Sequence, residues 1–329
     1  MFVSLRQHFR CSYYNKTMKT AKRDNVYNVF SKDNIPALKV CDNETFMAET
    51  QLNGGTWLNS IDDLWDPSKS RGPNLCTVIE VEDARPGDTL AVDIIDVKPG
   101  KLGYTGFAGW RNKLSQLIYP NDWDVVTKTV EIKDDHINWS DELKIPVKPM
   151  IGTIATAPAK GKQSTQYAYE NGGNMDVQEV SNGTTIYLPI NVEGALLHVG
   201  DCHAIMGDGE IPHGGAIECQ ALLTLRVRLI KGYKARKWIR MENDEYIMTI
   251  ANNIKIKDSF CEAAHELIDW MVDDYGFTPQ EAYLLLGQVL EARCTMLHGD
   301  DEPFSPYICK IRKEYLKPQE DPIWKKDSE

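Results

Sequence analysis

The residues best suited to chemistry lie in one stretch of the chain, residues 172–218. Among glycines and short apolar runs, the acidic and histidine side chains that matter most in this stretch are Asp176, Asp201, His203, Asp208, Glu210 and Glu218. Carboxylates and imidazoles bind divalent metals, and the same groups transfer protons in catalysis. The stretch therefore predicts a metal site or an acid–base site.

The spacing within this stretch indicates which side chains meet. Asp201 and His203 are two residues apart in a segment expected to be extended, so both leave one face and Cys202 leaves the other. The glycines on either side of Asp208 allow a sharp turn at positive φ that aims Asp208 back at this pair. We expect these acids and the histidine to converge on one ion.

Each of these signals also has an ordinary structural explanation. A histidine beside an acid is more often a hydrogen-bonded core pair than a metal ligand, and Gly-Asp-Gly-Glu is also a common surface turn. The acids do not have the spacing of an EF-hand calcium loop. The density of the stretch favours a site, because three of the seven histidines, His198, His203 and His213, lie close to the carboxylates.

Four motifs, in their order and spacing, resemble those of the acetamidase/formamidase family: Gly172-Gly173-Asn174-Met175-Asp176, Tyr187-Leu188-Pro189, Gly200-Asp201-Cys202-His203, and Gly207-Asp208-Gly209-Glu210 followed by Ile217-Glu218. The resemblance extends to residues 84–90 and 152–158 and covers most of the chain between residues 56 and 283. It implies a hydrolase that depends on a divalent metal. The implied reaction splits a short aliphatic amide, such as formamide or acetamide, into a carboxylate and ammonia.

The choice of metal ligands follows from the needs of that reaction. A catalytic metal keeps an open coordination position when the protein supplies about three ligands. Asp176, Asp201 and His203 are the first choices, with Asp208 as a fourth. Zinc is the expected metal. Calcium is the alternative, although it prefers six to eight oxygen ligands and uses a histidine poorly.

The remaining roles are assigned around this metal. We expect Glu218 and His203 to be catalytic, with Glu218 taking a proton from water and passing it to the departing ammonia. The residues expected to contact the substrate are Gly173, Asn174 and His213. Unlike the family pattern, this chain has Asn171 before its Gly-Gly-Asn-Met-Asp motif and Pro212-His213 after Gly-Asp-Gly-Glu. These differences leave the identity of the substrate open.

Three alternatives remain. A nucleophilic amidase would use Cys202, the only cysteine within the motifs, but its position opposite Asp201 and His203 does not favour activation. A β-rich binding protein would hold structural calcium without turnover. A hydrolase of an aryl acetamide, such as indole-3-acetamide, would use the aromatic side chains of an expected glycine-rich loop at residues 98–109.

The elements that must position these residues are mainly strands. Strict alternation over residues 217–229 predicts a half-buried strand with Glu218 at its start. Residues 184–191 and 195–199, separated by a turn, predict a hairpin, and one or two more strands are expected within residues 234–253. The predicted fold is predominantly β (α+β), with antiparallel strands and hairpins and a C-terminal helical pair.

Capping residues predict the two helices. Ser259 is expected to cap the first helix, and Gly276 to end it in the left-handed conformation. Thr278-Pro279-Gln280-Glu281 is a capping box with proline at the first helical position, and it predicts a second helix through about Met296.

Composition excludes several classes of protein. With 329 residues, of which 42% are hydrophobic, the chain can build a full core, and its net charge of −11 argues against a nucleic-acid partner. No segment is as apolar and long as a membrane span. Eight scattered cysteines without a Cys-x-x-Cys pair favour reduced thiols and a cytoplasmic location.

The chain is expected to divide into four parts. Residues 1–23 are basic and predict a disordered tail, with Met18 as an alternative start. Residues 24–150 form an N-terminal β-rich part, residues 151–303 the part with the motifs and helices, and residues 304–329 a charged tail, unless the whole is one compact unit. The helical pair and this tail predict a homo-oligomer, most simply a dimer.

Overall fold

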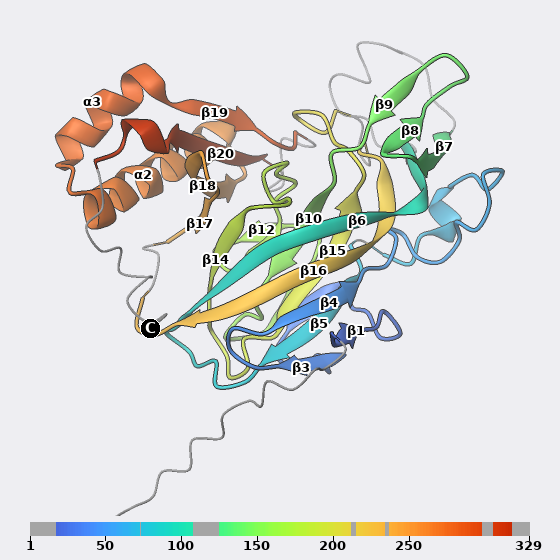
Figure 1. Ribbon diagram of the computed structural model, residues 1–329, viewed down its shortest axis with the longest axis horizontal. Coiled ribbons are helices and arrows are strands. Elements are labelled where there is room, and N and C mark those ends of the chain that lie inside the picture. Colours follow the sequence, from blue (N-terminus) through green and yellow to red (C-terminus); the bar gives the residue numbers. More distant parts are fainter. Residues whose placement is uncertain are drawn as a thin grey trace, which may run out of the picture.

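The structure is a computed structural model that describes residues 18–72, 74–107, 125–211, 215–233, 237–297 and 305–317. His213 and residues 1–17 of the expected basic tail lie outside these ranges. The described chain is mostly antiparallel β-structure, with two helices near its C-terminal end (Figure 1). The predicted fold class is therefore confirmed. Within the described residues, no helix is both long enough and apolar enough to cross a membrane.

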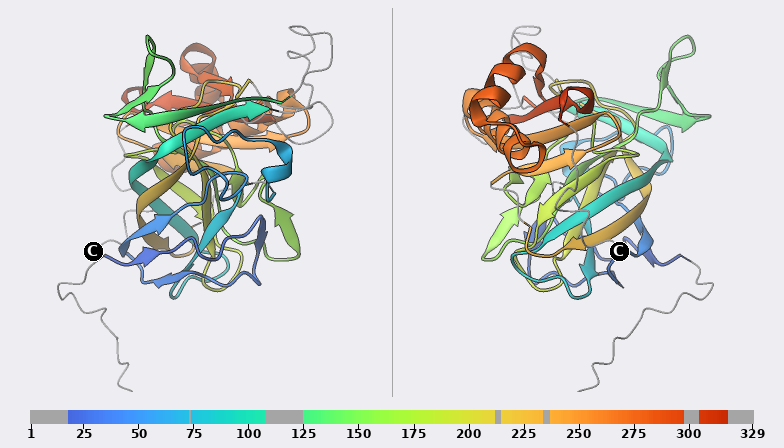
Figure 2. Two further views of the ribbon diagram at one scale, coloured as in Figure 1. Left: turned by 90° about the vertical axis from the view of Figure 1, so that its right-hand side faces the viewer. Right: turned by 60° about the vertical axis from the view of Figure 1, so that its left-hand side comes forward.

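Two long strands form the spine of the main sheet. β6 (Thr89–Phe107) and β16 (Glu218–Ile230) pair antiparallel, from Glu218 opposite Tyr104 to Ile230 opposite Thr89. The alternating residues of β16 are buried as predicted, because one face of this strand packs on the core. Around this pair the sheet curls over on itself (Figure 2).

The other strands of the main sheet are β1 (Thr20–Ala21), β3 (Leu38–Val40), β4 (Thr45–Glu49), β5 (Cys76–Val81), β7 (Val126–Lys133), β8 (His136–Asn138), β9 (Lys144–Pro146), β10 (Met150–Ala155), β12 (Ala168–Tyr169), β13 (Gly172–Asn174), β14 (Thr185–Pro189), β15 (Leu197–His203), β17 (Ile239–Glu242), β18 (Tyr246–Asn253), β19 (Glu291–Cys294) and β20 (Ser305–Arg312). A separate two-stranded sheet pairs β2 (Val29–Ser31) with β11 (Lys162–Ser164). Single 3₁₀ turns span Pro67–Lys69 and Lys313–Tyr315.

Strands from the two expected halves of the chain pair directly with each other. β14 pairs with β6, and β15 pairs with β5, both antiparallel. The main core accordingly draws on both halves, with fully buried side chains such as Val92, Leu188, Val199 and Leu225. Within the described residues, the pairing thus joins residues 24–150 to residues 151–303 in one core.

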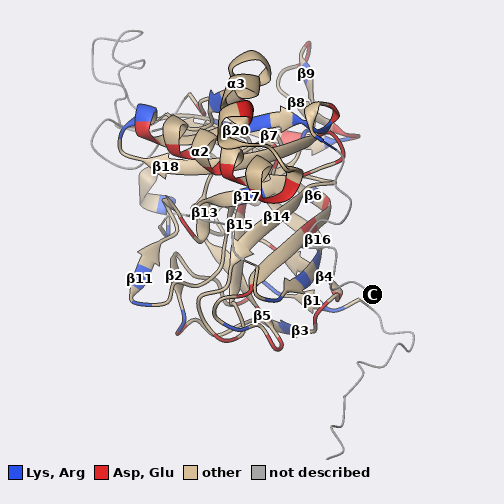
Figure 3. Ribbon diagram, turned by 90° about the vertical axis from the view of Figure 1, so that its left-hand side faces the viewer, with Lys and Arg blue, Asp and Glu red and all other residues tan. Residues whose placement is uncertain are grey.

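A helical layer covers β18 and β20 near the C-terminal end. It consists of α2 (Ile256–Tyr275) and α3 (Pro279–Val289), packed over a second core around the fully buried Trp270. Figure 3 shows α2 with Asp and Glu along much of its length and few Lys or Arg. The left-handed Gly276 and the capping box at Thr278 are confirmed.

Two predicted helix boundaries are wrong. Lys255, not Ser259, is the N-cap of α2; Ser259 is buried inside the first turns, where its hydroxyl accepts a hydrogen bond from the backbone N–H of Asn253. The second helix stops at Val289 instead of near Met296, because the chain turns there into β19 and pairs with β20.

Three predictions for the strands also need correction. Residues 184–199 do not form a hairpin, because β14 pairs with β6 and β17 whereas β15 pairs with β5, β10 and β16. Residues 98–107 belong to β6 and not to a loop; Pro99 and Gly100 are accommodated where the register with β16 shifts. Residues 305–312 form β20 instead of a tail.

Candidate metal and acid–base site

Three neighbouring strands bring the predicted site residues together. β10 pairs with β13 on one side, with Thr153 opposite Asn174, and with β15 on the other, with Thr153 opposite Gly200. Asp176 follows β13 by two residues. At the end of β15, His203 lies directly opposite Glu218, the first residue of β16. The pairing of strands distant in sequence thus builds the site.

The resulting cluster is compact and buried. One ligand atom each from Asp176, Asp201 and His203 can be chosen so that all three lie within 4.8 Å of one another. Nδ1 of His203 lies 3.9 Å from Oδ1 of Asp176, and its Nε2 lies 3.3 Å from Oε2 of Glu218. Asp176, Asp201, His203 and Glu218 are each at most 2% exposed. The cluster thus combines three carboxylates and one imidazole away from bulk water.

Glu210 brings a fourth carboxylate to this cluster. It is 5% exposed, and burial together with the nearby Asp176 raises its pKa well above the usual range. It belongs to the same Gly-Asp-Gly-Glu motif as Asp208. The side chain of Asp208, by contrast, is 69% exposed and pairs with Arg293 on β19. The turn at this motif therefore sends Glu210 inward and Asp208 outward.

Gly152 leaves the space in which two of these acids sit. A Cβ atom at this position would lie 2.5 Å from Oδ1 of Asp176 and 2.8 Å from Oδ2 of Asp201. Real Cβ atoms do not approach other atoms this closely, so any larger residue would displace a carboxylate. The glycine is required by the close approach of the two acids across β10.

Neutral side chains orient the acids. Nδ2 of Asn53 donates to Oδ1 of Asp201 at 2.9 Å and lies 3.4 Å from Oε1 of Glu218. The Thr153 hydroxyl lies within hydrogen-bonding distance of Asp201 (3.2 Å) and of Asn174 (2.8 Å). Asn53 was not identified from the sequence, because it lies 148 residues from Asp201 and no local pattern reports that contact. Its Asn-Gly-Gly context was the available signal.

The balance of charge and hydrogen bonding tests whether a cation fits here. Among the described residues, Oδ1 of Asp176, both ring nitrogens of His203 and Oε2 of Glu218 have no hydrogen-bond partner. Buried polar atoms are normally paired, and buried carboxylates normally meet a positive charge or a metal. A divalent cation coordinated by carboxylate oxygen and imidazole nitrogen would satisfy these atoms, so the donor set fits.

The pKa shifts have the same origin. Burial and the nearby Asp201 raise the pKa of Asp176 to about 8. Burial raises the pKa of Glu218, and Asp201 adds to the rise although His203 opposes it. Burial disfavours the charged imidazole, but Glu218 and Asp201 raise the pKa of His203 well above its usual range. All three shifts arise because several buried acids share a single imidazole as their nearby positive charge.

The backbone is strained at three of the acids. Asp176, Asp201 and Glu210 have φ values of 45°, 55° and 42°, in the left-handed region that side chains other than glycine rarely adopt. Such strain persists only where the surrounding structure enforces it, and it is common at functional sites. The strained residues are therefore the same acids whose side chains meet in the buried cluster.

The other candidate residues fall in different places. Gly173 and Asn174 lie buried on β13; Gly173 runs so close to Tyr167 that a Cβ would lie 2.3 Å from its carbonyl oxygen.

Burial raises the pKa of Cys202 to about 12, so the thiolate needed by a nucleophilic amidase is scarce at neutral pH.

A groove of about 540 Å³ lies elsewhere, lined in part by Tyr169, Asn171 and Trp238. None of the clustered acids lines it. Asn171, the residue that departs from the family pattern, donates to the carbonyl of Thr156 at 2.6 Å. That departure therefore changes this groove and not the cluster.

The comparisons with known proteins agree with the motifs. The family model described as "Acetamidase/Formamidase family" matches residues 14–165 and 160–297. The acetamidase of Mycolicibacterium smegmatis is 29% identical over 213 residues, 47% of this chain and 52% of that protein. The chain spans between 15% and 65% of the length of the curated relatives that it matches.

Solved structures of the family share the fold. A crystal structure of a predicted acetamidase/formamidase from Thermoanaerobacter tengcongensis has a TM-score of 0.82 and 28% identity, covering 90% of this chain and 96% of that one. The acetamidase of Bacillus halodurans has a TM-score of 0.80 and 27% identity, covering 90% of this chain and 98% of that one. The motifs, the fold and the family model agree, and the chain belongs to the acetamidase/formamidase family.

Proposed function

We propose that this protein hydrolyses a short aliphatic amide, such as formamide or acetamide, to a carboxylate and ammonia with the help of a divalent metal, zinc in the first place. The observation that carries this proposal is the buried cluster of Asp176, Asp201, His203 and Glu218. Several of its oxygen and nitrogen atoms that could bind a metal have no hydrogen-bond partner among the described residues. Membership of the family supports an amide as the substrate.

Asp176, Asp201 and His203 would hold the metal. When bound, a divalent cation supplies a Lewis acid for the amide carbonyl and lowers the pKa of water. Carboxylate oxygen and imidazole nitrogen are both ligands that zinc accepts, and catalytic zinc sites use three protein ligands, whereas calcium takes more oxygen ligands. Three protein ligands also leave room for substrate and water.

Glu218 is the proposed general base. Oε1 of Glu218 faces Asn53, and Oε2 faces the ring of His203. The raised pKa of Glu218 lies closer to neutral pH than that of an ordinary carboxyl, and a carboxyl is most efficient at both accepting and donating a proton when its pKa is near the working pH. Glu218 takes a proton from the attacking water and delivers a proton to the departing nitrogen. Its place at the rigid start of β16 keeps the carboxyl oriented.

The burial of the cluster favours a small substrate. Each of its acids is at most 5% exposed, which suits a molecule of a few heavy atoms better than an extended peptide. One observation favours an aryl acetamide as a second candidate. Trp57 and Trp65 lie 4.8 Å and 6.1 Å from the ring of Tyr104, and the Tyr104 hydroxyl donates to the carbonyl of Asn53 beside the site.

The test measures ammonia release and metal content on the same preparation. Formamide, acetamide, propionamide and indole-3-acetamide are assayed before chelation, after exhaustive chelation, and after return of Zn²⁺ or Ca²⁺. We expect turnover of a short amide, its loss on chelation and its recovery with Zn²⁺, together with a higher melting temperature of the metal-bound protein. Full turnover after metal removal would refute metal dependence. Stoichiometric metal without any ammonia would support the non-catalytic binding protein.

A further inference from the structure

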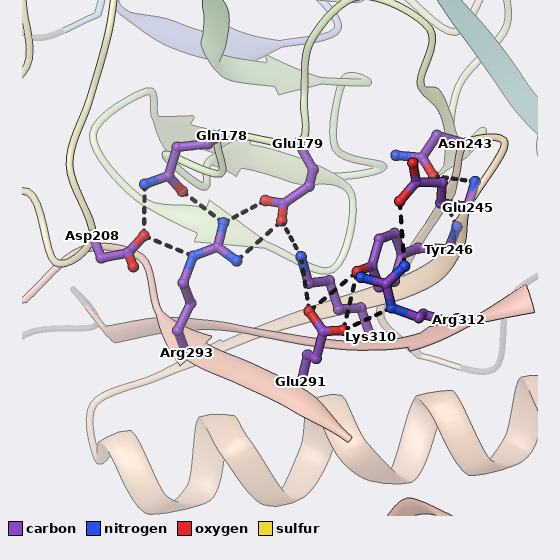
Figure 4. A network of polar contacts seen from close by, with 10 residues as sticks. All are labelled: Gln178, Glu179, Asp208, Asn243, Glu245, Tyr246, Glu291, Arg293, Lys310 and Arg312. Atoms are coloured by element: carbon purple, nitrogen blue, oxygen red, sulfur yellow. Dashed lines mark hydrogen bonds and ion pairs between the residues drawn. The ribbon is translucent and has the colours of Figure 1, made fainter. Parts of the chain in front are cut away.

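An ion-pair network connects the strands under the helical layer to the segments that carry two of the clustered acids. It joins β19 and β20 to two loops of the motif region, as Figure 4 shows. Arg293 on β19 lies at one end of this network. Its Nε lies 2.9 Å from Oδ1 of Asp208, and its Nη1 lies 3.0 Å from Oε1 of Glu179. Nη2 of Arg293 donates to Oε1 of Gln178 at 2.8 Å.

The partners of Arg293 are close in sequence to the clustered acids. Gln178 and Glu179 follow Asp176 by two and three residues, and Asp208 precedes Glu210 by two. Gln178 also donates directly to Asp208 at 2.9 Å, so the two loops are joined to each other as well as to Arg293. One guanidinium thus spans the two segments that deliver Asp176 and Glu210.

Residues just after β19 hold the same two segments. The N–H of Leu297 donates to the carbonyl of Gly209 at 3.0 Å, and the hydroxyl of Thr295 donates to the carbonyl of Met175 at 2.8 Å. Gly209 and Glu210 both have positive φ, so the turn at residues 207–210 is sharp. Its direction depends on contacts with other parts of the chain. The contacts with residues 293–297 supply that direction.

We propose that Arg293 is a positioning residue, which fixes the turn at Asp208 and thereby holds the Glu210 carboxyl in the cluster beside Asp176. The planar fork of an arginine side chain can bind both loops at once, whereas the single ammonium of a lysine cannot do so with the same geometry. The effect on catalysis rests on the proposed amide hydrolysis; the effect on the turn does not.

The first arm of the experiment measures kinetics. Arg293→Ala is compared with Arg312→Ala, a matched control in the same network whose ion pairs with Glu245 and Glu291 do not touch either loop. Arg293 also holds the segment that delivers Asp176, a proposed metal ligand, and a small misplacement in an active site costs up to about 10²-fold in rate, so we expect kcat of Arg293→Ala to fall by about 10- to 100-fold with little change in KM. Arg312→Ala should keep the wild-type kcat, and Arg293→Lys should recover only part of the loss.

The second arm measures the turn itself by hydrogen exchange of a peptide that covers residues 206–211. Arg293→Ala and Asp208→Ala should both accelerate its exchange, and Arg312→Ala should not. Asp208 is exposed, so its variant remains informative if Arg293→Ala fails to fold. The double variant should show less than the sum of the two single effects, because both remove the same contact.

The outcomes separate the two proposals. Exchange at residues 206–211 that is unchanged in both single variants would overturn the positioning role, whatever the kinetics. A lower melting temperature of Arg293→Ala with unchanged kcat and exchange would show that the ion pair only stabilises the fold. If the wild-type protein releases no ammonia from any amide, the proposed function fails, and the exchange arm still decides whether Arg293 fixes the turn.

Discussion

His198 and His203 lie on the same strand, and both are buried, but their surroundings differ. In His198, Nδ1 contacts the carbonyl of Leu196 at 2.7 Å and Nε2 contacts Nδ2 of Asn34 at 2.9 Å. The Nδ2 nitrogen of Asn34 can only donate, so Nε2 of His198 accepts and Nδ1 carries the proton. This neutral ring is fully satisfied. Burial lowers its pKa to about 4.

His203 has the opposite environment. Its ring faces three acids, among them Asp176 and Glu218, and among the described residues neither nitrogen has a hydrogen-bond partner. Burial alone therefore does not distinguish a functional histidine from a structural one. The difference lies in whether the polar atoms are satisfied within the protein.

Substitution of each histidine should give the largest contrast. We expect His203→Ala to lose bound metal and amidase activity together, down to the level of the metal-free protein, because removal of a ligand weakens affinity directly. His198→Gln should keep both the metal and the activity per folded molecule, since Gln can still accept from Asn34. Metal analysis and ammonia release on the two purified variants check this. Retention of metal in His203→Ala would remove His203 from the ligand set.

Glu218→Gln should separate the ligands from the base. The amide keeps the size and the hydrogen-bonding capacity of the side chain but cannot accept a proton from water. We expect metal content to stay near stoichiometric while kcat falls by about 10²–10⁴, the usual contribution of positioned proton transfer. Asp201→Asn is the matched comparison and should lose metal. Loss of metal from Glu218→Gln would instead make Glu218 a ligand, and the role of base would pass to Glu210.

Gly152→Ala tests the close approach of the acids. The added Cβ would collide with carboxylate oxygens of both Asp176 and Asp201, so metal affinity and activity should fall by about 10- to 100-fold, as when groups that orient ligands are changed. Gly287→Ala on α3 is the control, because a Cβ there meets no atom within 4 Å. It should leave activity unchanged and stabilise the helix by up to about 1 kcal/mol. Equal activity of both variants would contradict the described packing.

His198 should also make the free energy of unfolding depend on pH, with a loss of stability in acid. Its folded pKa of about 4 lies below the ordinary value of about 6.5, so the unfolded chain binds more protons in between. The stability is present above pH ~6.5 and is lost as the pH falls to about 4, a change of about 3 kcal/mol. Urea unfolding of wild type and His198→Gln at pH 7 and pH 4 measures it. A difference between the two proteins that is independent of pH would show that His198 does not titrate as described.

Local patterns predicted the elements whose reasons are local. The alternation of residues 217–229 specified β16, and the capping box at Thr278 specified the start of α3. The supposed hairpin at residues 184–199 failed because each strand pairs with strands elsewhere in the chain, such as β6, whose paired residues lie more than 90 residues before those of β14. Sequence periodicity reports which face of a strand is buried, but not what lies beside it.

The candidate site shows the same division. The two-residue spacing of Asp201 and His203 predicted that both leave the same face of the chain, and both lie in the cluster with Asp176. The Gly-Asp-Gly-Glu motif predicted a turn but not its direction, because that direction depends on Arg293 and Leu297, almost 90 residues further along the chain. Asp208 was therefore expected at the ion, whereas Glu210 is the acid that the turn buries.

The left-handed backbone at Asp176, Asp201 and Glu210 has a consequence for the evolution of this fold. Each non-glycine residue in that conformation costs about 1 kcal/mol or more, and glycine or asparagine would relieve the cost. Burial of each carboxylate adds a further penalty. Selection for thermal stability alone would therefore replace these acids before most surface residues. Only selection on what the site binds or converts can maintain all three, and a relative that has lost that selection should lose the acids first.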